Sequence, residues 1–428
     1  MPTTSSLPSR RLRWLVVVML FGLSCASYVE RMNISVAAEL MMPALSLSKG
    51  DMALIFNSFL IGYAIFQVPA GWLGDRFGSR LVLGASSFLW GLLTLLSGLL
   101  PGTALRTAFG TIALLWLLRF LLGATEASTY PVAAQAVHRW MTPSRRGAGN
   151  SLMLMGSSVA SALTAPFVSW SMLRYGWRAS FYLTSIAAFA ISLLWLSFTR
   201  TPPPADHATS MPVSTGQTKS TWNLNVILLS LSYMSEGYLL FMFVSWLYIY
   251  LVEVRGFSLA RGGLVASLPW IAAIIATPLG GILSDRLSVR FGRVQSARIL
   301  IMTGYMLSGT LLLAAAQAHS RLSAVLALCI SLASLYLAES SFWTTAIAIA
   351  GTNAGVVSGF MNTIGILGGI VSNAAVPVLL KHYGHDGWIM AFGSGTGMGL
   401  LCAALWWILG KRLSCNELQT DIYPSLHR

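Results

Sequence analysis

Six ionisable side chains stand out because they lie within long apolar segments of the chain. They are Glu30, Arg31, Arg119, Glu126, Glu236 and Glu339. A charge at the centre of a bilayer costs roughly 2.5–3.5 kcal/mol on insertion scales, so such residues are the first candidates for function. The two cations of the set, Arg31 and Arg119, both belong to the first half of the chain.

Two arginines that border a water-filled cavity could bind a small anion, because guanidinium forks match carboxylate-type groups. Arg119 and Glu126 are two helical turns apart, about 10 Å along one face of a helix. A glutamate partly removed from water favours its protonated form, so proton and anion movement could be coupled there. An alternative is a buried ion pair, Arg119–Glu126 or Glu30–Arg119, that only fixes helix packing.

The elements that must position these residues are membrane helices. Hydrophobic residues make up 55% of the chain and charged residues 9%, against about 25% charged in soluble proteins. The net charge of +14 comes from basic residues that stand in short clusters between apolar segments rather than on one face. This arrangement predicts a lipid bilayer, and no nucleic acid, as the partner of the chain.

Twelve apolar segments are long enough to cross a hydrocarbon layer of ~30 Å. The predicted spans are 14–37, 51–73, 80–100, 107–136, 147–170, 178–198, 223–252, 261–284, 296–317, 321–347, 354–379 and 387–410. Their backbone groups must be satisfied internally, so the fold class is an all-α integral membrane protein with twelve transmembrane helices.

The chain divides into two six-helix halves. Residues 199–222, which include Pro202-Pro203-Pro204, are too polar to bury themselves and are predicted to be a cytoplasmic linker. The predicted halves are therefore 1–198 and 223–411, and 412–428 form a cytoplasmic tail. Lys and Arg are roughly twice as numerous on the side of the termini, which predicts that both termini are cytoplasmic.

One junction motif occurs in both halves. Its residues are Gly71, Asp75, Arg76, Gly78 and Arg80 in the first half, with a weaker copy at Asp285 and Arg286. A repeated junction is typical of transporters built from related halves. We expect the motif to act in the conformational switch: its glycines allow close packing and a tight turn, and Asp75 accepts from a helix N-terminus or an arginine.

The paired junction, the twelve spans and the central linker resemble the major facilitator superfamily. The run Glu30-Arg31-Met-Asn33-Ile-Ser35, with Arg119-Phe-Leu-Leu-Gly123-Ala-Thr-Glu126, is similar to its anion:cation symporter family. This resemblance implies a proton-coupled symporter of sugar acids or other small organic anions in the cell (inner or plasma) membrane. The proton is favoured over sodium as the coupling ion, and a monomer is expected.

The resemblance also implies roles for individual residues. Arg31 and Arg119 would bind the substrate anion, and Glu30 and Glu126 would carry the proton. Tyr63, Trp343 and Asn362 fall where the family places polar or aromatic cavity groups; packing at an aromatic belt or between helices is the alternative. Glu30 replaces the family's usual aspartate with a longer arm, and Arg145-Arg146 replace an acid–arginine pair.

Three other functions stay open as alternatives. An organophosphate exchanger could also use two arginines, and counterflow without a pH gradient would reveal it. A drug:proton antiporter is disfavoured because the glycine pattern of its fifth span is incomplete after Gly156. A sensor or membrane enzyme is disfavoured because no extramembrane segment is large enough and no catalytic constellation occurs. The cysteines lack metal-site spacing, so neither a metal nor a cofactor is expected.

Overall fold

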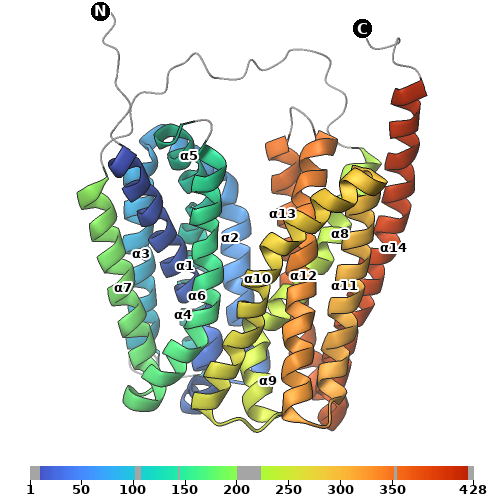
Figure 1. The fold of residues 1–428 in the computed structure, drawn as a ribbon. Coiled ribbons are helices and arrows are strands. Elements are labelled where there is room, and N and C mark those ends of the chain that lie inside the picture. Colours follow the sequence, from blue (N-terminus) through green and yellow to red (C-terminus); the bar gives the residue numbers. More distant parts are fainter. Residues whose placement is uncertain (1–9, 102–107, 143–144, 200–222, 351–353, 423–428) are drawn as a thin grey trace, which may run out of the picture. The chain divides into compact units, whose positions relative to one another are not determined.

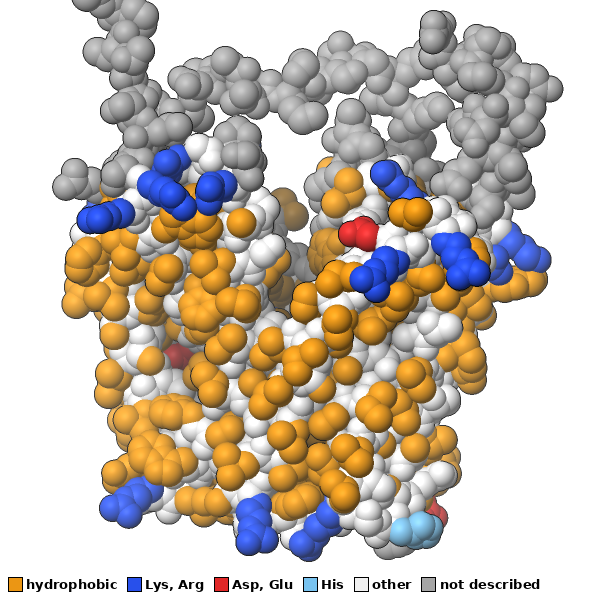
Figure 2. Space-filling view, in the orientation of Figure 1, with side chains coloured by type: hydrophobic (Ala, Val, Ile, Leu, Met, Phe, Trp, Pro, Cys, Tyr) orange, Lys and Arg blue, Asp and Glu red, His pale blue; other side chains and the backbone are white. Residues whose placement is uncertain are grey.

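The computed structural model describes residues 10–101, 108–142, 145–199, 223–350 and 354–422. Within them, twelve helices are long and apolar enough to cross a membrane, which confirms the predicted fold class. Apart from Thr199, the expected linker lies outside the described residues. Figure 2 shows hydrophobic side chains over the middle of each unit's visible face, with Lys and Arg gathered toward its two ends.

The chain folds into two compact units, each seen as a bundle of helices in Figure 1. The first unit contains Met1–Thr209 and Val244–Ser267. Its helices are α1 (Arg10–Leu45), α2 (Lys49–Phe77), α3 (Ser79–Leu99), α4 (Ala108–Glu126), α5 (Thr129–Trp140), α6 (Arg146–Tyr175), α7 (Trp177–Phe198), α9 (Leu247–Glu253) and the first residues of α10 (Leu259–Phe291).

The second unit contains Ser210–Phe243 and Leu268–Arg428. Its helices are α8 (Leu224–Phe241), the rest of α10, α11 (Arg293–Gln317), α12 (Arg321–Ala350), α13 (Ala354–Tyr383), a 3-10 turn (Gly384–Asp386) and α14 (Gly387–Ile422). The second part of the seventh span, from Val244 onward, thus belongs to the first unit, whereas the sequence suggested a division at the linker. The chain passes between the units at a π-helical turn, Met242–Trp246.

Two predicted spans are each made of two helices. Span four is α4 followed by α5, and span seven is α8 followed by the π-turn and α9. Pro131 explains the first break, because it has no N–H to donate to the carbonyl of Ala127. Two hydroxyls satisfy the neighbouring carbonyls: Thr129 donates to the carbonyl of Glu126 (2.7 Å) and Ser128 to that of Thr125 (3.0 Å). Glu126 is therefore the last residue of α4.

Glycines bring helices into backbone contact beside the candidate residues Tyr63, Arg119 and Glu126. A Cβ on Gly123 of α4 would lie 2.0 Å from the carbonyl oxygen of Phe59, and one on Gly62 of α2 would lie 2.1 Å from that of Phe120. The second unit has a similar crossing of α8 and α13, where a Cβ on Gly237 would meet the carbonyl of Gly365. Side chains on α2 and α4 can face α1 because these two helices touch so closely.

Gly123→Ala is expected to destabilise the protein by about 1–3 kcal/mol or more, because the added methyl must push backbone rather than a flexible side chain. The measurement is the thermal unfolding of purified protein in detergent. Gly397→Ala on α14 is the matched control, because a Cβ there meets nothing within 4 Å. Equal melting temperatures for the two variants would contradict the close crossing.

The junction motif ends in the same turn in both halves. Gly78, after α2, has φ 80° and ψ 154°, and Gly292, after α10, has φ 82° and ψ 160°. These positive φ values favour glycine. Gly78 thus lies at a turn between α2 and α3, and in the second half α10 continues past Ser288 to Phe291 before it turns.

Candidate functional site

Arg31 of α1 and Glu126 of α4 form an ion pair inside the first unit. The Nη2 atom of Arg31 lies 3.3 Å from Oε2 of Glu126, and the two side chains are 10% and 0% exposed. The hydroxyl of Ser27, one turn before Arg31, donates to the same oxygen at 3.0 Å. The other oxygen, Oε1, has no hydrogen-bond partner among the described residues. A buried carboxylate is thus held by one cation and one hydroxyl.

Aromatic rings surround the guanidinium of Arg31. Its Cζ atom lies 4.7 Å from the ring centroid of Tyr28 and 4.9 Å from those of Phe59 and Tyr63. Such contacts contribute about 0.5–2 kcal/mol each and orient the planar group. Tyr63, a predicted site residue, is thus in contact with Arg31. The spacing could have indicated the other two, since Tyr28 precedes Arg31, and Phe59 precedes Tyr63, by one helical turn.

Arg119 is directed at the backbone of α1. Its Nη1 donates to the carbonyl of Glu30 (3.1 Å) and its Nη2 to the carbonyl of Arg31 (3.0 Å), while Phe59 covers its Cζ at 5.0 Å. The residue is 3% exposed. Arg119 therefore joins α4 to α1 at the residues that flank the site. Both ion pairs considered from the sequence involved Arg119, whereas the pair observed among these buried side chains is Arg31–Glu126.

Glu30 is a buried acid without a hydrogen-bonded carboxyl oxygen in the described part of the chain. It is 1% exposed, and neither carboxyl oxygen has a hydrogen-bond partner among the described residues. The polar and charged side chains close enough to interact with its carboxyl are Thr94 of α3, Glu126 and Arg119. A buried ionised carboxylate without partners is costly, so Glu30 stays a candidate for the proton-binding role that the sequence predicted.

The predicted site residues of the second unit, Trp343 and Asn362, lie on two helices that both pack against α8. The Trp343 indole of α12 donates to Oε1 of Glu339 at 3.5 Å, and its ring lies 5.9 Å from that of Tyr233 on α8. Asn362 of α13 is half-buried, one turn before Gly365, which packs against the Tyr233 ring. Both α8 and α12 continue unbroken past their glutamates, so neither acid caps a helix break.

The junction residues lie mostly on the surface of their units. Asp75, Arg76, Arg80, Asp285 and Arg286 are all exposed. Arg80 donates from Nη2 to the carbonyl of Leu196 at the end of α7 (2.6 Å). Helices α2 and α5 approach each other closely at Gly74, where a Cβ would lie 2.7 Å from the Val132 side chain. A Cβ on Gly71 would be 3.9 Å from its nearest neighbour, an ordinary van der Waals distance. The carboxylate of Asp75 has no partner among the residues that the structure describes.

Another ionisable group in the first unit lies beyond the end of a predicted span. Helix α1 continues to Leu45, so Glu39 belongs to it and is half-buried. Its carboxyl interacts electrostatically with Glu253 of α9 and with Lys49. These two residues form an ion pair, with Nζ of Lys49 2.5 Å from Oε2 of Glu253. That pair joins the start of α2 to the end of α9. The predicted limit at residue 37 concealed Glu39, and Pro43 did not end the helix.

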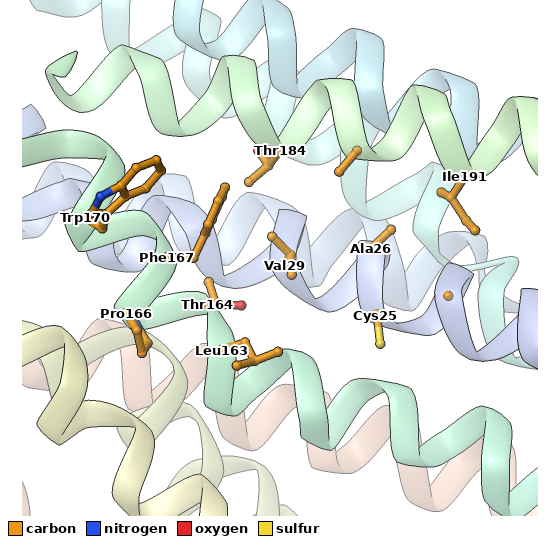
Figure 3. A pocket seen from close by; sticks show the side chains of 12 residues that line it. Cys25, Ala26, Val29, Leu163, Thr164, Pro166, Phe167, Trp170, Thr184 and Ile191 are labelled. Carbon is orange, nitrogen blue, oxygen red and sulfur yellow. The ribbon is translucent and has the colours of Figure 1, made fainter. Parts of the chain in front are cut away.

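A lateral pocket of about 640 Å³ opens between α1, α6 and α7 (Figure 3). Its lining is apolar, and Leu163 and Trp170 at its rim are 60% and 53% exposed. Val29 lines it, whereas Arg31, two residues later, is about 200° away around α1. The pocket contains no charged side chain and does not suit a small anion. Helix α1 thus has an apolar face and a charged face.

Comparisons with known proteins agree with this architecture. The sequence model of the Major Facilitator Superfamily matches residues 19–373. The chain is 30% identical to a probable sulfoacetate transporter, SauU, of Cupriavidus necator, over 90% of this chain and 92% of that protein. It is also 30% identical to the hexuronate transporter of Bacillus subtilis, over 82% and 85%.

The fold is similar to that of a solved bacterial homologue of the human lysosomal transporter Spinster. The TM-score is 0.76 at 17% identity, and the match covers 94% of this chain and 98% of that structure.

Proposed function

This chain belongs to the Major Facilitator Superfamily, and on that premise we propose that it takes up a small organic anion together with protons by alternating access. The predicted superfamily and the prediction of a multi-pass membrane transporter rather than an enzyme are confirmed. We propose a carboxylate or sulfonate as substrate, because relatives are named as sulfoacetate, galactarate/D-glucarate and hexuronate transporters.

The observation that carries the proposal is the Arg31–Glu126 pair. Arg31 is a partly exposed guanidinium oriented by aromatic rings, and its counter-ion is a buried carboxylate. A proton on Glu126 would remove that negative charge and free the guanidinium fork for the anion. Release of the anion would favour loss of the proton and re-formation of the pair. Proton and anion would then travel together.

The remaining site residues take supporting roles in this scheme. Arg119 adds positive charge and holds the α1 backbone through the carbonyls of Glu30 and Arg31, so we assign it chiefly to positioning. Glu30 would be the partner of Glu126 in proton transfer. Tyr63 orients Arg31 from α2, while Trp343 and Asn362 would contact the substrate within the second unit. The junction motif serves the conformational switch, without contacting substrate.

Uptake into proteoliposomes tests the proposal. Purified protein is first screened by thermal shift against sulfoacetate, glucarate and glucuronate, and the stabilising anion is then offered with an inward proton gradient. We expect accumulation above equilibrium that a protonophore abolishes and that a sodium gradient does not restore. Counterflow that ignores the proton gradient would instead indicate an exchanger, such as one for organophosphates. Absence of both gradient-driven uptake and counterflow for every stabilising anion would reject transport of this class.

We propose the cell membrane as location, with both termini cytoplasmic and a monomer as the working form. The bias of Lys and Arg toward the terminal side supports this orientation.

A further inference from the structure

The second unit contains two acids that the scheme above does not use. Glu236 of α8 is 7% exposed, and Glu339 of α12 is half-buried. Every described Lys and Arg of this unit lies near the end of a membrane-spanning segment. The two carboxyls therefore have no cationic partner at their depth, unlike Glu126, which has Arg31.

Ring contacts place the two acids at the same level. Tyr233 of α8 contacts Phe342 and Trp343 of α12, with ring centroids 5.0 and 5.9 Å apart. Glu236 lies three residues after Tyr233, about 4.5 Å along the axis of α8. Glu339 lies three residues before Phe342, the same distance along the axis of α12. Spans seven and ten run in opposite directions because two spans, the eighth and the ninth, lie between them in the chain. Both steps therefore go the same way and bring the carboxyls together.

The electrostatic surroundings agree with this placement. Glu339 is the charged group that acts on Glu236. The one hydrogen bond described for Glu339 comes from the Trp343 indole, 3.5 Å away. Two carboxylates so placed repel each other in a medium of low dielectric constant, which disfavours the doubly ionised pair.

A tyrosine hydroxyl shares the same site. Tyr305 of α11 is 0% exposed, and its hydroxyl has no hydrogen-bond partner among the described residues. Its ring centroid lies 5.3 Å from that of Phe342. Glu236, Glu339, Tyr233 and Cys402 are all close enough to interact electrostatically with its hydroxyl. An unpaired buried hydroxyl is costly, so a further hydrogen-bonding group is expected beside it.

We propose that Glu236 and Glu339 form a second proton-binding site, in which the two carboxyls share a proton and Tyr305 completes the hydrogen bonding. The carboxyl O–H of one glutamate donates to the carboxylate of the other, which removes one of two buried negative charges. A neutral acid also needs no counter-cation, in agreement with the absence of Lys and Arg at this depth among the described residues of the unit. The ligand is a proton that exchanges with water, and no covalent step is involved.

Infrared titration of the full-length protein tests the site without any transport assay. In the Glu30→Gln/Glu126→Gln background, a protonated-carboxyl band that titrates with pH should persist. Adding Glu236→Gln or Glu339→Gln should remove or shift it, and Tyr305→Phe should shift it. Asp386→Asn, a substitution in the 3-10 turn at the end of α13, should leave it unchanged.

Two results would overturn the site: a band that is unchanged when either glutamate is replaced, and a signal that responds to sodium but not to pH, which would indicate a metal-cation site. Glutamine has nearly the shape of protonated glutamate, so we expect Glu236→Gln and Glu339→Gln to fold. Either variant alone is sufficient for the test.

The consequence for coupling rests on the proposed function. If protons drive uptake, Glu236→Gln should lower the proton-to-anion ratio measured from reversal potentials in proteoliposomes. An intact infrared signature in a protein that transports no anion would leave this site standing and reject the proposed function. Normal uptake with an unchanged ratio would reject the coupling role of the pair.

Discussion

Arg31→Ala is expected to abolish uptake of the organic anion in a protein that still folds and inserts. The substitution removes the guanidinium and leaves the carboxylate of Glu126 with only the Ser27 hydroxyl. In the proposed complex Arg31 pairs with the anion, and loss of one partner of such a buried charge pair costs about 2–5 kcal/mol. This cost corresponds to at least a roughly 30-fold loss of affinity for the anion. The measurement is anion uptake into proteoliposomes, with reconstituted protein quantified in parallel.

Further substitutions separate the roles of charge and geometry. Arg31→Lys keeps the charge but not the planar fork, so we expect weakened binding with residual uptake. Arg174→Ala removes an exposed cation at the end of α6 and should transport as the wild type does. Arg119→Ala should lower the melting temperature as well as uptake, because it breaks the contacts from α4 to the α1 carbonyls. Wild-type uptake by Arg31→Ala would remove Arg31 from the binding site.

Glu126→Gln should lose accumulation driven by the proton gradient while it keeps exchange of anion across the membrane. Glutamine has the shape of a protonated glutamate and can still accept from Ser27, but it cannot gain or lose a proton. Arg31 is then permanently without its counter-ion, so anion binding should persist or strengthen. The two measurements are uptake with a pH gradient and counterflow without one.

Glu253→Gln is the matched control in the same unit, because this acid is partly exposed at the end of α9 and pairs with Lys49. It should retain gradient-driven uptake. Accumulation by Glu126→Gln that still follows the pH gradient would take Glu126 off the proton path and leave Glu30 as the candidate of the first unit.

Much of the architecture could be predicted because the bilayer imposes few solutions. Apolar runs of spanning length must be helices, since no water is present to satisfy an open backbone. All twelve spans are found, and errors are confined to their ends, such as α1 continuing past residue 37. Helix ends are harder because Pro43 and the charged residues near it are compatible with both helix and loop.

The candidate site could be predicted in part. A charge inside an apolar run is visible in the sequence, so Glu30, Arg31, Arg119 and Glu126 could be identified from residue types alone. Their partners could not, because residues of α1 and α4 meet only through the packing of both helices. Arg119 illustrates this: its sequence position suggests anion binding, whereas its guanidinium contacts two backbone carbonyls, which no residue pattern encodes.

The sequence by itself determined that this protein spans a membrane with twelve helices, contains a repeated junction and carries its buried arginines in the first half. Local composition is sufficient for each of these properties. Only the tertiary structure decided that Arg31 pairs with Glu126, that the second part of span seven belongs to the first unit, and that Glu236 and Glu339 lie at one level. The physical reason is that these features depend on which helix faces touch, and those contacts join residues far apart in the chain.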